Sequence, residues 1–534
     1  MKRFYEIIPG FFCWTTLLTP FVLAIFWPMY LAYFIILYDL YWLYKTFVMG
    51  THLILGYAHL RHGIEIDWME RLLELKNLDN YLFNLKKKIR YSRGFVKSKL
   101  KEEWEEISLL KEKEKILIDW QNLYQAVIFP TYKEEVDTLR ASISACQKSL
   151  WPKERMIVVL GIEKREGFSG RKKAEILRKE FSNVFYKFLV TEHPENLKGE
   201  MKAKGANLTY AARQLQKFLD QEKIDYKNVI VSAFDSDTRP HPQYFACLAY
   251  KFIVNPNRLR RTFQPIPLYS NNIWEVTFLT RLVALSASFW QMIEATRPYR
   301  MINFSSQAMS MQTLVEIDFW DTNIVSEDSR QFFRAYFTYA GDHQVVPLFT
   351  PVYMDAIAGR NLWDTFRQQY LQKRRWAYGV EHFPYLCKEL PRHKEIPLLS
   401  RLLVFWRQFE GHYSWATASL LLLTIGWLPF ALSPVFRTTI LAYKFPQLAR
   451  YLLSLAWIGI VVSTFISLGL LPHKPKRYGF RKTLEIYLQW IFVPIPAIFF
   501  GSIPAIDAQT RLMLGKYLGF WVTPKIYHQS DAKQ

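Results

Sequence analysis

Two aspartates, one residue apart, follow directly after an apolar run. Asp235 and Asp237 flank Ser236, and the preceding segment Val229–Phe234 has the composition of a buried strand. Carboxylates spaced in this way at the end of a strand can hold a divalent cation and a ribose together. Mg²⁺ binds few protein carboxylates and leaves its other positions to water and phosphate oxygens, so the triplet suits a phosphorylated ligand. Triplets of this kind also occur by chance on protein surfaces.

A second acidic pair, Glu327 and Asp328, follows Ser326 further along the chain. A carboxylate placed opposite a departing group can remove the proton from an attacking hydroxyl, as a single-displacement reaction requires. The alternative is a helix that begins at Ser326 and carries acidic residues in its first turn.

A basic and aromatic motif, Gln372-Lys373-Arg374-Arg375-Trp376, lies in a strongly helical stretch, Leu362–Tyr378. Gln372, Arg375 and Trp376 stand at i, i+3 and i+4 and therefore share one helix face. An arginine can bind a diphosphate through two parallel hydrogen bonds, and an indole offers a flat apolar surface to a sugar ring. A helix at a membrane surface, with Trp363 and Trp376 as anchors, would show the same pattern.

Short apolar runs and amphipathic stretches alternate in front of these motifs. Such alternation predicts an α/β fold with a mainly parallel sheet covered by helices, in which ligands bind at the carboxyl ends of the strands. We expect this domain to cover residues 126–385, including a helix at the membrane interface. The predicted strands are Ala126–Phe129, Met156–Leu160, Val184–Val190 and Val229–Phe234, and the predicted helices between them are Glu135–Leu150 and Gly205–Leu219.

The composition indicates membrane segments. Half of the 534 residues are hydrophobic and 17% are aromatic, and the net charge is +22. A nucleic-acid binder would also be basic, but no zinc spacing, RNA-recognition signature or basic zipper accompanies the charge. Basic loops beside a membrane and a positive field around a phosphorylated donor explain it better. The four cysteines are scattered, which disfavours a disulfide framework or a zinc site.

The apolar block from Pro9 to Val48 is long enough for two spans, since one span needs roughly 20 residues. We therefore expect two transmembrane helices within residues 1–49. Residues 50–125 are charged and helical and predict a solvated amphipathic hairpin, with contact to a membrane surface as the alternative.

The C-terminal part, residues 386–534, is apolar again. It contains two predicted spans, 413–432 and 451–471, and a proline-rich segment, 484–506, that we expect to be broken or re-entrant. The loop 472–483 is much more basic than the loop 433–450, so the positive-inside rule places it in the cytosol. With two N-terminal spans, the same rule places the α/β domain in the cytosol and the chain in the plasma (inner) membrane.

The order of the motifs resembles that of the family 2 glycosyltransferases, in particular the membrane-integrated processive synthases of the cellulose and hyaluronan type. The motifs run, in chain order, as Pro130-Thr131-Tyr132-Lys133-Glu134, Glu163, Lys204-Gly205-Ala206-Asn207, Asp235-Ser236-Asp237, Ser326-Glu327-Asp328 and Gln372-Lys373-Arg374-Arg375-Trp376. The resemblance covers about residues 125–385 and implies a GT-A fold, an inverting reaction and Mg²⁺ or Mn²⁺.

The resemblance also implies roles for single residues on the donor side. Thr131, Tyr132 and Glu134 would line the base and ribose pocket, and Lys204 would approach the diphosphate. Glu163 stands where the family usually has Asp, which puts its base or ribose contact in doubt. Asp235 would face the donor and share the metal with Asp237.

On the acceptor side, Asp328 beside Glu327 would be the general base. Gln372 and Arg375 would hold the diphosphate, and Trp376 would stack near the acceptor. Two departures stand out. Ser326 replaces the usual Thr, and the segment Asn303–Gln307 lacks the glycines of the family. The segment Phe520-Trp521-Val522-Thr523-Pro524-Lys525 is similar to the gating loop of the synthases.

These expectations combine into one hypothesis: transfer of a sugar from a nucleotide-diphosphate donor, with a UDP-sugar preferred, to a glycan or lipid acceptor at the cytosolic membrane face. Polysaccharide synthesis is the preferred form. Transfer of a single sugar to a lipid carrier and a non-enzymatic membrane scaffold are the alternatives. No nucleic-acid partner is expected, and assembly into a homo-oligomer stays open.

Overall fold

The computed structural model describes residues 2–112 and 118–519. The segment 520–525, which is similar to a gating loop, lies outside the described residues. The chain divides into two compact units. The first unit contains the described residues of Met1–Tyr57, Tyr269–Thr296 and Asp355–Ile526, and the second those of Ala58–Leu268 and Arg297–Met354. Each unit is described by itself.

The second unit is built around one mixed sheet of eight strands in the order β3-β2-β1-β4-β7-β6-β8-β5. β1 pairs in parallel with β2 and β4, and β2 pairs in parallel with β3. β6 pairs in parallel with β8, whereas β7 and β5 run antiparallel to their neighbours. The strands are β1 (Tyr124–Pro130), β2 (Met156–Glu163), β3 (Lys187–His193), β4 (Val229–Ala233), β5 (Arg239–Pro240), β6 (Arg261–Leu268), β7 (Ala308–Ser310) and β8 (Gln344–Tyr353).

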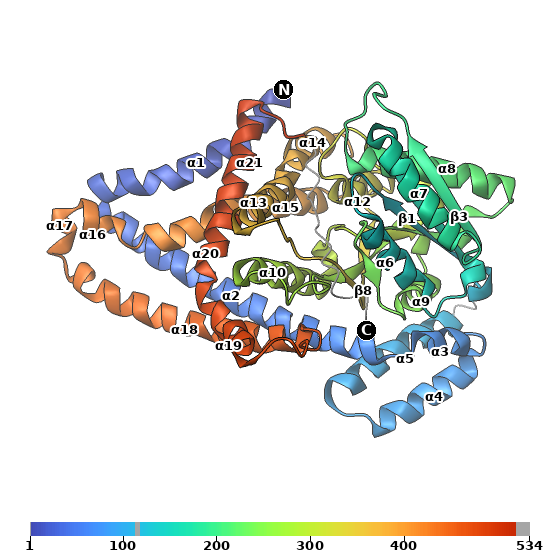
Figure 1. The fold of residues 1–534 in the computed structure, drawn as a ribbon. Coiled ribbons are helices and arrows are strands. Elements are labelled where there is room, and N and C mark those ends of the chain that lie inside the picture. Colours follow the sequence, from blue (N-terminus) through green and yellow to red (C-terminus); the bar gives the residue numbers. More distant parts are fainter. Residues whose placement is uncertain (1, 113–117, 520–534) are drawn as a thin grey trace. The chain divides into compact units, whose positions relative to one another are not determined.

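Helices cover both faces of this sheet (Figure 1). Successive residues of a strand point to opposite faces. Val127 and Phe129 accordingly pack with α6, α7 and α9, while Ala126 and Ile128 pack with α8 and α11. The helices of this unit are α6 (Val136–Gln147), α7 (Phe168–Phe181), α8 (Lys204–Gln221), α9 (Tyr244–Val254), α11 (Met311–Glu316) and α12 (Glu327–Thr338). The prediction of a mainly parallel sheet with flanking helices is confirmed.

The charged segment after the first apolar block is helical, as expected, but only one side of it faces solvent. It forms α3 (Trp68–Glu74), α4 (Leu78–Tyr91) and α5 (Gly94–Glu112). Trp68, Tyr81 and Ile107 are buried in the same hydrophobic core as β1 and α9. The Tyr81 hydroxyl also lies 3.1 Å from that of Tyr250 on α9. The apolar face of this amphipathic segment therefore belongs to the core of the second unit.

The first unit is helical in its described part. Its elements are α1 (Lys2–Phe26), α2 (Pro28–Glu65, whose last residues belong to the second unit), α10 (Phe278–Ala295), α13 (Leu362–Ala377), α14 (His382–Glu389), α15 (Leu398–Thr424), α16 (Leu428–Leu432), α17 (Pro434–Arg437), α18 (Ile440–Leu470), α19 (Phe480–Leu488), α20 (Pro494–Ala497) and α21 (Ile503–Leu514).

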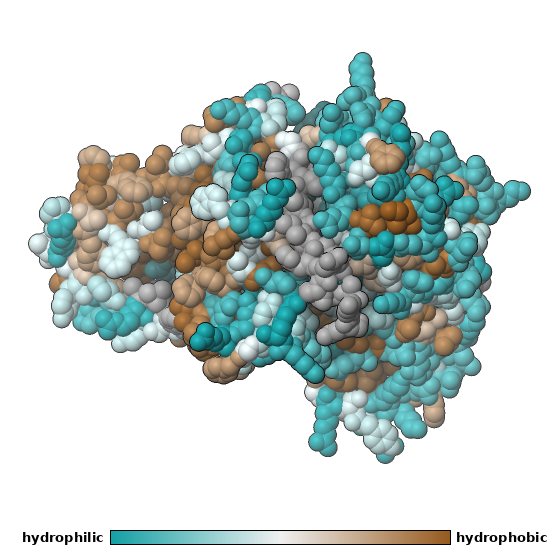
Figure 2. Space-filling model, in the orientation of Figure 1, coloured by the Kyte–Doolittle hydropathy of each residue, from teal (hydrophilic) through white to brown (hydrophobic). Residues whose placement is uncertain are grey.

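Two of these helices, α1 and α2, are long and apolar enough to cross a membrane. Large apolar side chains such as Phe21, Phe26 and Tyr30 are exposed on them. Figure 2 shows hydrophobic side chains gathered over α1 and near α16. The prolines of the segment 484–506 coincide with a bend of 49° between Phe480–Phe492 and Pro494–Leu514, which together form a third candidate, either as a broken span or as a re-entrant loop.

Candidate active site

Polar side chains follow the carboxyl ends of four neighbouring parallel strands in the second unit. Thr131 follows β1, Asp235 follows β4, and Glu163 and His193 are the last residues of β2 and β3. Because β3, β2, β1 and β4 are parallel neighbours, these ends lie along one edge of the sheet. Ligands of open α/β sheets bind at this edge, so the sheet gathers the predicted donor-side residues where a ligand would be expected.

The ammonium group of Lys204, at the start of α8, lies among three carboxylates. Its Nζ is 2.7 Å from Oδ1 of Asp235, 3.3 Å from Oδ2 of Asp328 and 3.5 Å from Oε1 of Glu327. Asp235 comes from the loop after β4, and the other two carboxylates begin α12. Three motifs that are far apart in the sequence therefore meet at one cation.

The surrounding carboxylates stabilise the protonated form of Lys204. Burial by itself lowers the pKa of its ammonium group, but attraction to Asp235, Asp328 and Glu327 outweighs burial and raises the pKa above its ordinary value. Lys204 therefore stays protonated across the physiological range and offsets part of the negative charge of the cluster.

The two acidic residues at the start of α12 differ in access. The side chain of Glu327 is only 4% exposed, whereas that of Asp328 is 20% exposed. Asp328 also accepts a hydrogen bond of 3.3 Å from the amide nitrogen of Gln307. Asp328 is thus the more accessible carboxylate of this pair, and Gln307 and Lys204 fix its orientation.

The carboxylate oxygens of Asp235 and Asp237 are suitable ligands for a hard divalent cation such as Mg²⁺. Asp235 is partly exposed, and its Oδ2 accepts a hydrogen bond of 2.7 Å from the Ser305 hydroxyl. Asp237 is 1% exposed. Within residues 2–112 and 118–519, no group of three or more His, Cys, Asp or Glu side chains is arranged as a metal site. Asp235 and Asp237 would supply two carboxylates to such an ion and leave its other positions to phosphate oxygens and water.

Close packing holds the start of α8 against the acidic cluster. A Cβ atom on Gly205 would lie 2.6 Å from the carbonyl oxygen of Asp321 and 3.1 Å from Cβ of Glu327. Asn207 donates a hydrogen bond of 2.9 Å to the carbonyl oxygen of Gly161 in β2. The small residue and the amide of this motif thus fix Lys204 relative to the sheet edge.

The loop after β1 is held by an ion pair that the sequence did not reveal. Glu134 accepts hydrogen bonds from the hydroxyl of Thr131, at 2.8 Å, and from the backbone N–H of Tyr132, at 2.6 Å. Lys173 donates to Thr131 Oγ1 and pairs with Glu166 at 2.8 Å, with both side chains of the pair almost fully buried. Burial raises the pKa of the Glu134 carboxyl, which the hydrogen bonds from Thr131 and Tyr132 oppose.

Glu163 belongs to a buried cluster that sequence reasoning also missed. His193 Nδ1 lies 3.3 Å from Oε2 of Glu163, and its Nε2 lies 2.9 Å from Oε2 of Glu200. Arg165 donates to the same oxygen of Glu163 at 3.1 Å, and its guanidinium lies 4.0 Å from the centre of the Tyr132 ring. Glu163 and His193 are the last residues of the parallel strands β2 and β3. A search for polar, titratable residues at the end of each predicted parallel strand would therefore have found His193 together with Glu163.

The segment Asn303–Gln307, which lacks glycine, contains a residue in the left-handed backbone conformation that favours glycine. Ser306 has φ 66°, in the left-handed region, and is fully buried. Its hydroxyl lies 3.2 Å from that of Thr238. The conformation that favours glycine is therefore present although the residue type is not.

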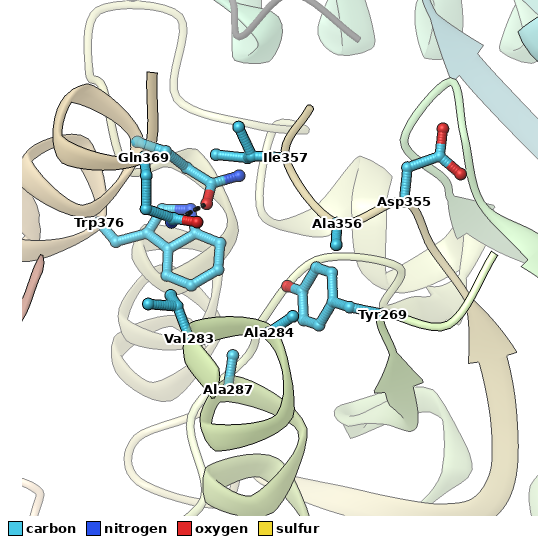
Figure 3. Close-up of a pocket in the computed structure, with 10 residues that line it drawn as sticks. Tyr269, Val283, Ala284, Ala287, Asp355, Ala356, Ile357, Gln369 and Trp376 are labelled. Atoms are coloured by element: carbon cyan, nitrogen blue, oxygen red, sulfur yellow. Dashed lines mark hydrogen bonds between the residues drawn. The ribbon is translucent and has the colours of Figure 1, made fainter. Parts of the chain in front are cut away.

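The Gln372–Trp376 motif lies in the first unit, on α13, as the helical pattern predicted. Gln372 and Trp376 are among the residues that line a small hollow, in which Trp376 lies opposite Val283 and Ala284 (Figure 3). The ring centres of Trp376 and Tyr269 are 6.3 Å apart, and Gln369 donates a hydrogen bond of 3.3 Å to Gln372. Arg375 is not among the lining residues. The other residues around the hollow are Val283, Ala284, Ala287, Asp355, Ala356 and Ile357.

Side chains in and next to the motif bind α13 to a neighbouring helix. Arg374 and Tyr370 each donate a hydrogen bond of 2.9 Å to Asp507 on α21. Lys373 Nζ lies 4.2 Å from the centre of the Trp376 ring. Burial lowers the pKa of Lys373 to about 7.

Searches against models of known protein families and against curated proteins find no match. Among solved structures, the chain is similar to the mannosyltransferase PcManGT from Pyrobaculum calidifontis in complex with GDP-Man and Mn²⁺. This match has 12% identity and a TM-score of 0.38, and covers 84% of this chain and 99% of that one. It is also similar to S. aureus TarS 1-349 in complex with UDP-GlcNAc, with 14% identity, a TM-score of 0.35 and coverage of 65% and 91%. Identities and TM-scores as low as these carry no argument about function.

Proposed function

We propose that this protein is a membrane-integrated family 2 glycosyltransferase. It would transfer a sugar, by inversion, from a nucleoside-diphosphate donor to a glycan or lipid acceptor at the cytosolic membrane face. The observation that carries the proposal is the meeting of Asp235, Glu327 and Asp328 around the ammonium group of Lys204, at the carboxyl edge of a parallel sheet. Such a transfer needs a cation for the leaving diphosphate and a carboxylate for the attacking hydroxyl, and this cluster contains both.

On the donor side, Lys204 at the start of α8 would bind the diphosphate, where the positive end of the helix dipole adds to its charge. Thr131, Tyr132, Glu134 and Glu163 would form the base and ribose pocket. A UDP-sugar is the donor we prefer. Mg²⁺ or Mn²⁺ on Asp235 and Asp237 would stabilise the charge that develops on the leaving diphosphate.

On the acceptor side, Asp328 would accept the proton of the attacking hydroxyl as the new glycosidic bond forms and the bond to the diphosphate breaks. Gln307 and Lys204 already orient its two oxygens. Protonation of Asp328 also weakens its attraction to Lys204, which would free that ammonium group to bind the leaving diphosphate more strongly.

In this proposal, the acceptor would bind at the Gln372–Trp376 motif of the first unit. The rings of Tyr269 and Trp376 flank a hollow with the amides of Gln369 and Gln372 beside them. Apolar rings next to polar groups are the surface on which a sugar ring stacks while its hydroxyls form hydrogen bonds. For this reason we favour a growing glycan over a single lipid acceptor.

The test is the substitution Asp328→Asn in membranes that contain the full chain. The amide keeps the shape of the side chain but cannot accept the proton, so transfer of radiolabelled sugar should fall by about 10²–10⁴-fold, while binding of the nucleotide donor persists. Asp318→Asn is the matched control, because Asp318 is an exposed carboxylate of the same unit.

Wild-type activity after Asp328→Asn would exclude Asp328 as the base. A wild-type protein that binds no nucleotide sugar would instead favour the scaffold hypothesis. The length of the labelled product separates the remaining forms, since a ladder of lengths indicates polymerisation and a single addition indicates a lipid-carrier transferase.

A further inference from the structure

The outer face of α4 carries a stripe of cations and one aromatic ring. Phe83, Lys86, Lys87 and Arg90 stand at i, i+3, i+4 and i+7, so they lie on one side of the helix. All four are exposed. Tyr81 and Leu85, on the opposite side, are 1% exposed and belong to the hydrophobic core of the second unit. The burial of the inner face therefore fixes the stripe in an outward direction.

The charge continues beyond α4. Between Lys86 and Lys101 the chain has eight lysines and arginines and no acidic residue. Lys99 pairs with Glu102 on α5 at 2.5 Å. In the described part of the chain, the other seven basic residues of this segment form no ion pair. A concentration of like charges destabilises a fold by self-repulsion, which an anionic partner would relieve.

Apolar side chains stand among the charges. Phe83 is 68% exposed, and Tyr91 at the end of α4 is 76% exposed. Val96 in the first turn of α5 is exposed as well. The place of α4 and α5 in Figure 1 corresponds to a mainly hydrophilic surface in Figure 2. Basic side chains interleaved with exposed aromatic ones are typical of helices that lie on anionic membranes.

We propose that this surface, consisting of Phe83, Lys86, Lys87, Arg90, Tyr91, Arg93 and Lys97, binds the headgroups of anionic phospholipids. The segment follows α2, a candidate membrane span that ends at Glu65, and a cluster of four to eight basic residues close to a span is a recognised mark of anionic-lipid binding. Phosphates would pair with the lysines and arginines, and the two rings would enter the headgroup region. Sugar transfer is not required for this contact.

The test uses the full chain in lipid nanodiscs, with Tyr91→Cys as the attachment point of a fluorophore and Cys387→Ser as background. The other three cysteines are buried. A quencher is placed at the level of the lipid headgroups. We expect quenching in discs of phosphatidylcholine with phosphatidylglycerol but not in phosphatidylcholine alone. Raising the salt from about 0.1 M to about 1 M should remove it, because the Debye length falls from about 10 Å to about 3 Å.

The triple variant Lys86→Glu, Lys87→Glu and Arg90→Glu should lower the apparent association with anionic lipid on the order of 100-fold. Lys172→Glu, Lys217→Glu and Lys223→Glu change the same charge on exposed positions of α7 and near the end of α8 and should leave it unchanged. Retained gel-filtration behaviour shows that both variants are folded. Equal quenching in both lipids, absence of quenching, or a fluorophore response to soluble polyphosphate but not to anionic discs would each overturn the proposal.

Discussion

At the scale of single residues, the candidate site depends on the balance between one ammonium group and three carboxylates. Lys204 offsets three carboxylates, and it is itself stabilised by them against the cost of burial. Neither the lysine nor the acidic residues would keep this arrangement alone. The same holds for His193, which joins Glu163 and Glu200 at the neighbouring strand ends.

Replacement of Lys204 by Met should therefore destabilise the second unit as well as weaken donor binding. We expect a loss of about 2–3 kcal/mol, less than for a fully buried pair, because Asp235 and Asp328 remain partly exposed. Urea unfolding measures the loss of stability, and Lys202→Met, at an exposed position, is the control. A Lys204→Met protein as stable as wild type would contradict this account of the cluster.

His193 should make the stability of the site dependent on pH. Burial opposes its protonation, but hydrogen bonds with Glu163 and Glu200 outweigh burial and raise its pKa. A group whose pKa is raised by folding contributes stability below its unfolded pKa of about 6.5, and this contribution is lost as the pH rises through the folded value. His193→Gln should flatten the pH dependence of the unfolding midpoint.

His473→Gln, at an exposed histidine, should leave that dependence unchanged. If wild type and His193→Gln respond to pH alike, His193 does not carry a proton between the two glutamates.

At the scale of elements, the site depends on how closely α8 and α12 approach each other. Lys204 and Glu327 are the first residues of these helices, so a small shift of either helix changes the distances within the cluster. Gly205 permits this close approach of the two helices, because there is no space at its position for a side chain.

Gly205→Ala should push α8 away from Asp321 and Glu327. The backbone oxygen of Asp321 would lie 2.6 Å from the new Cβ and cannot rotate away, so we expect a cost of about 1–3 kcal/mol from overpacking and a marked fall in transfer activity. Gly50→Ala in α2 is the control, since nothing lies within 4 Å of its Cβ position. Activity assays and thermal unfolding of both variants test this, and unchanged activity of Gly205→Ala would show that the packing is not critical.

At the scale of the whole molecule, the chain joins a helical unit with two candidate membrane spans to an α/β unit with the acidic cluster. The turn between α1 and α2 lies at Trp27, and the basic segment 472–483 includes the first turn of α19. If both helices cross the bilayer, this turn lies on the opposite side from the start of α1 and the end of α2.

A membrane-impermeant thiol reagent should therefore label Trp27→Cys from outside the cell. It should label Lys227→Cys, an exposed position of the second unit, only after the membrane is opened. Cys387→Ser provides the background, as the remaining cysteines are buried. Labelling of Lys227→Cys in intact cells would place the α/β unit outside and contradict the cytosolic orientation.

Local patterns in the sequence predicted the elements that depend on neighbouring residues alone. The apolar runs that became β1, β2 and β4 and the amphipathic repeats of α6, α8 and α13 were predicted with small errors at their ends. β6 and β8 were not predicted, because prolines interrupt both strands and only pairing across the sheet supports them. Charge in residues 50–125 predicted the helices but not the burial of Trp68, Tyr81 and Ile107.

The chemical groups of this protein, their order along the chain and its apolar helices can all be read from the sequence, because composition and periodicity are local properties. Which of these groups meet depends on how distant segments pack in three dimensions. Lys204 joined the acidic pair and Asp235 because the ends of parallel strands lie along one edge of the sheet, and Asp328 rather than Glu327 remained accessible because of packing around α12. The same holds for His193, for Lys173 and for the outward face of α4. Their surroundings could not be predicted locally, because their neighbours come from distant parts of the chain.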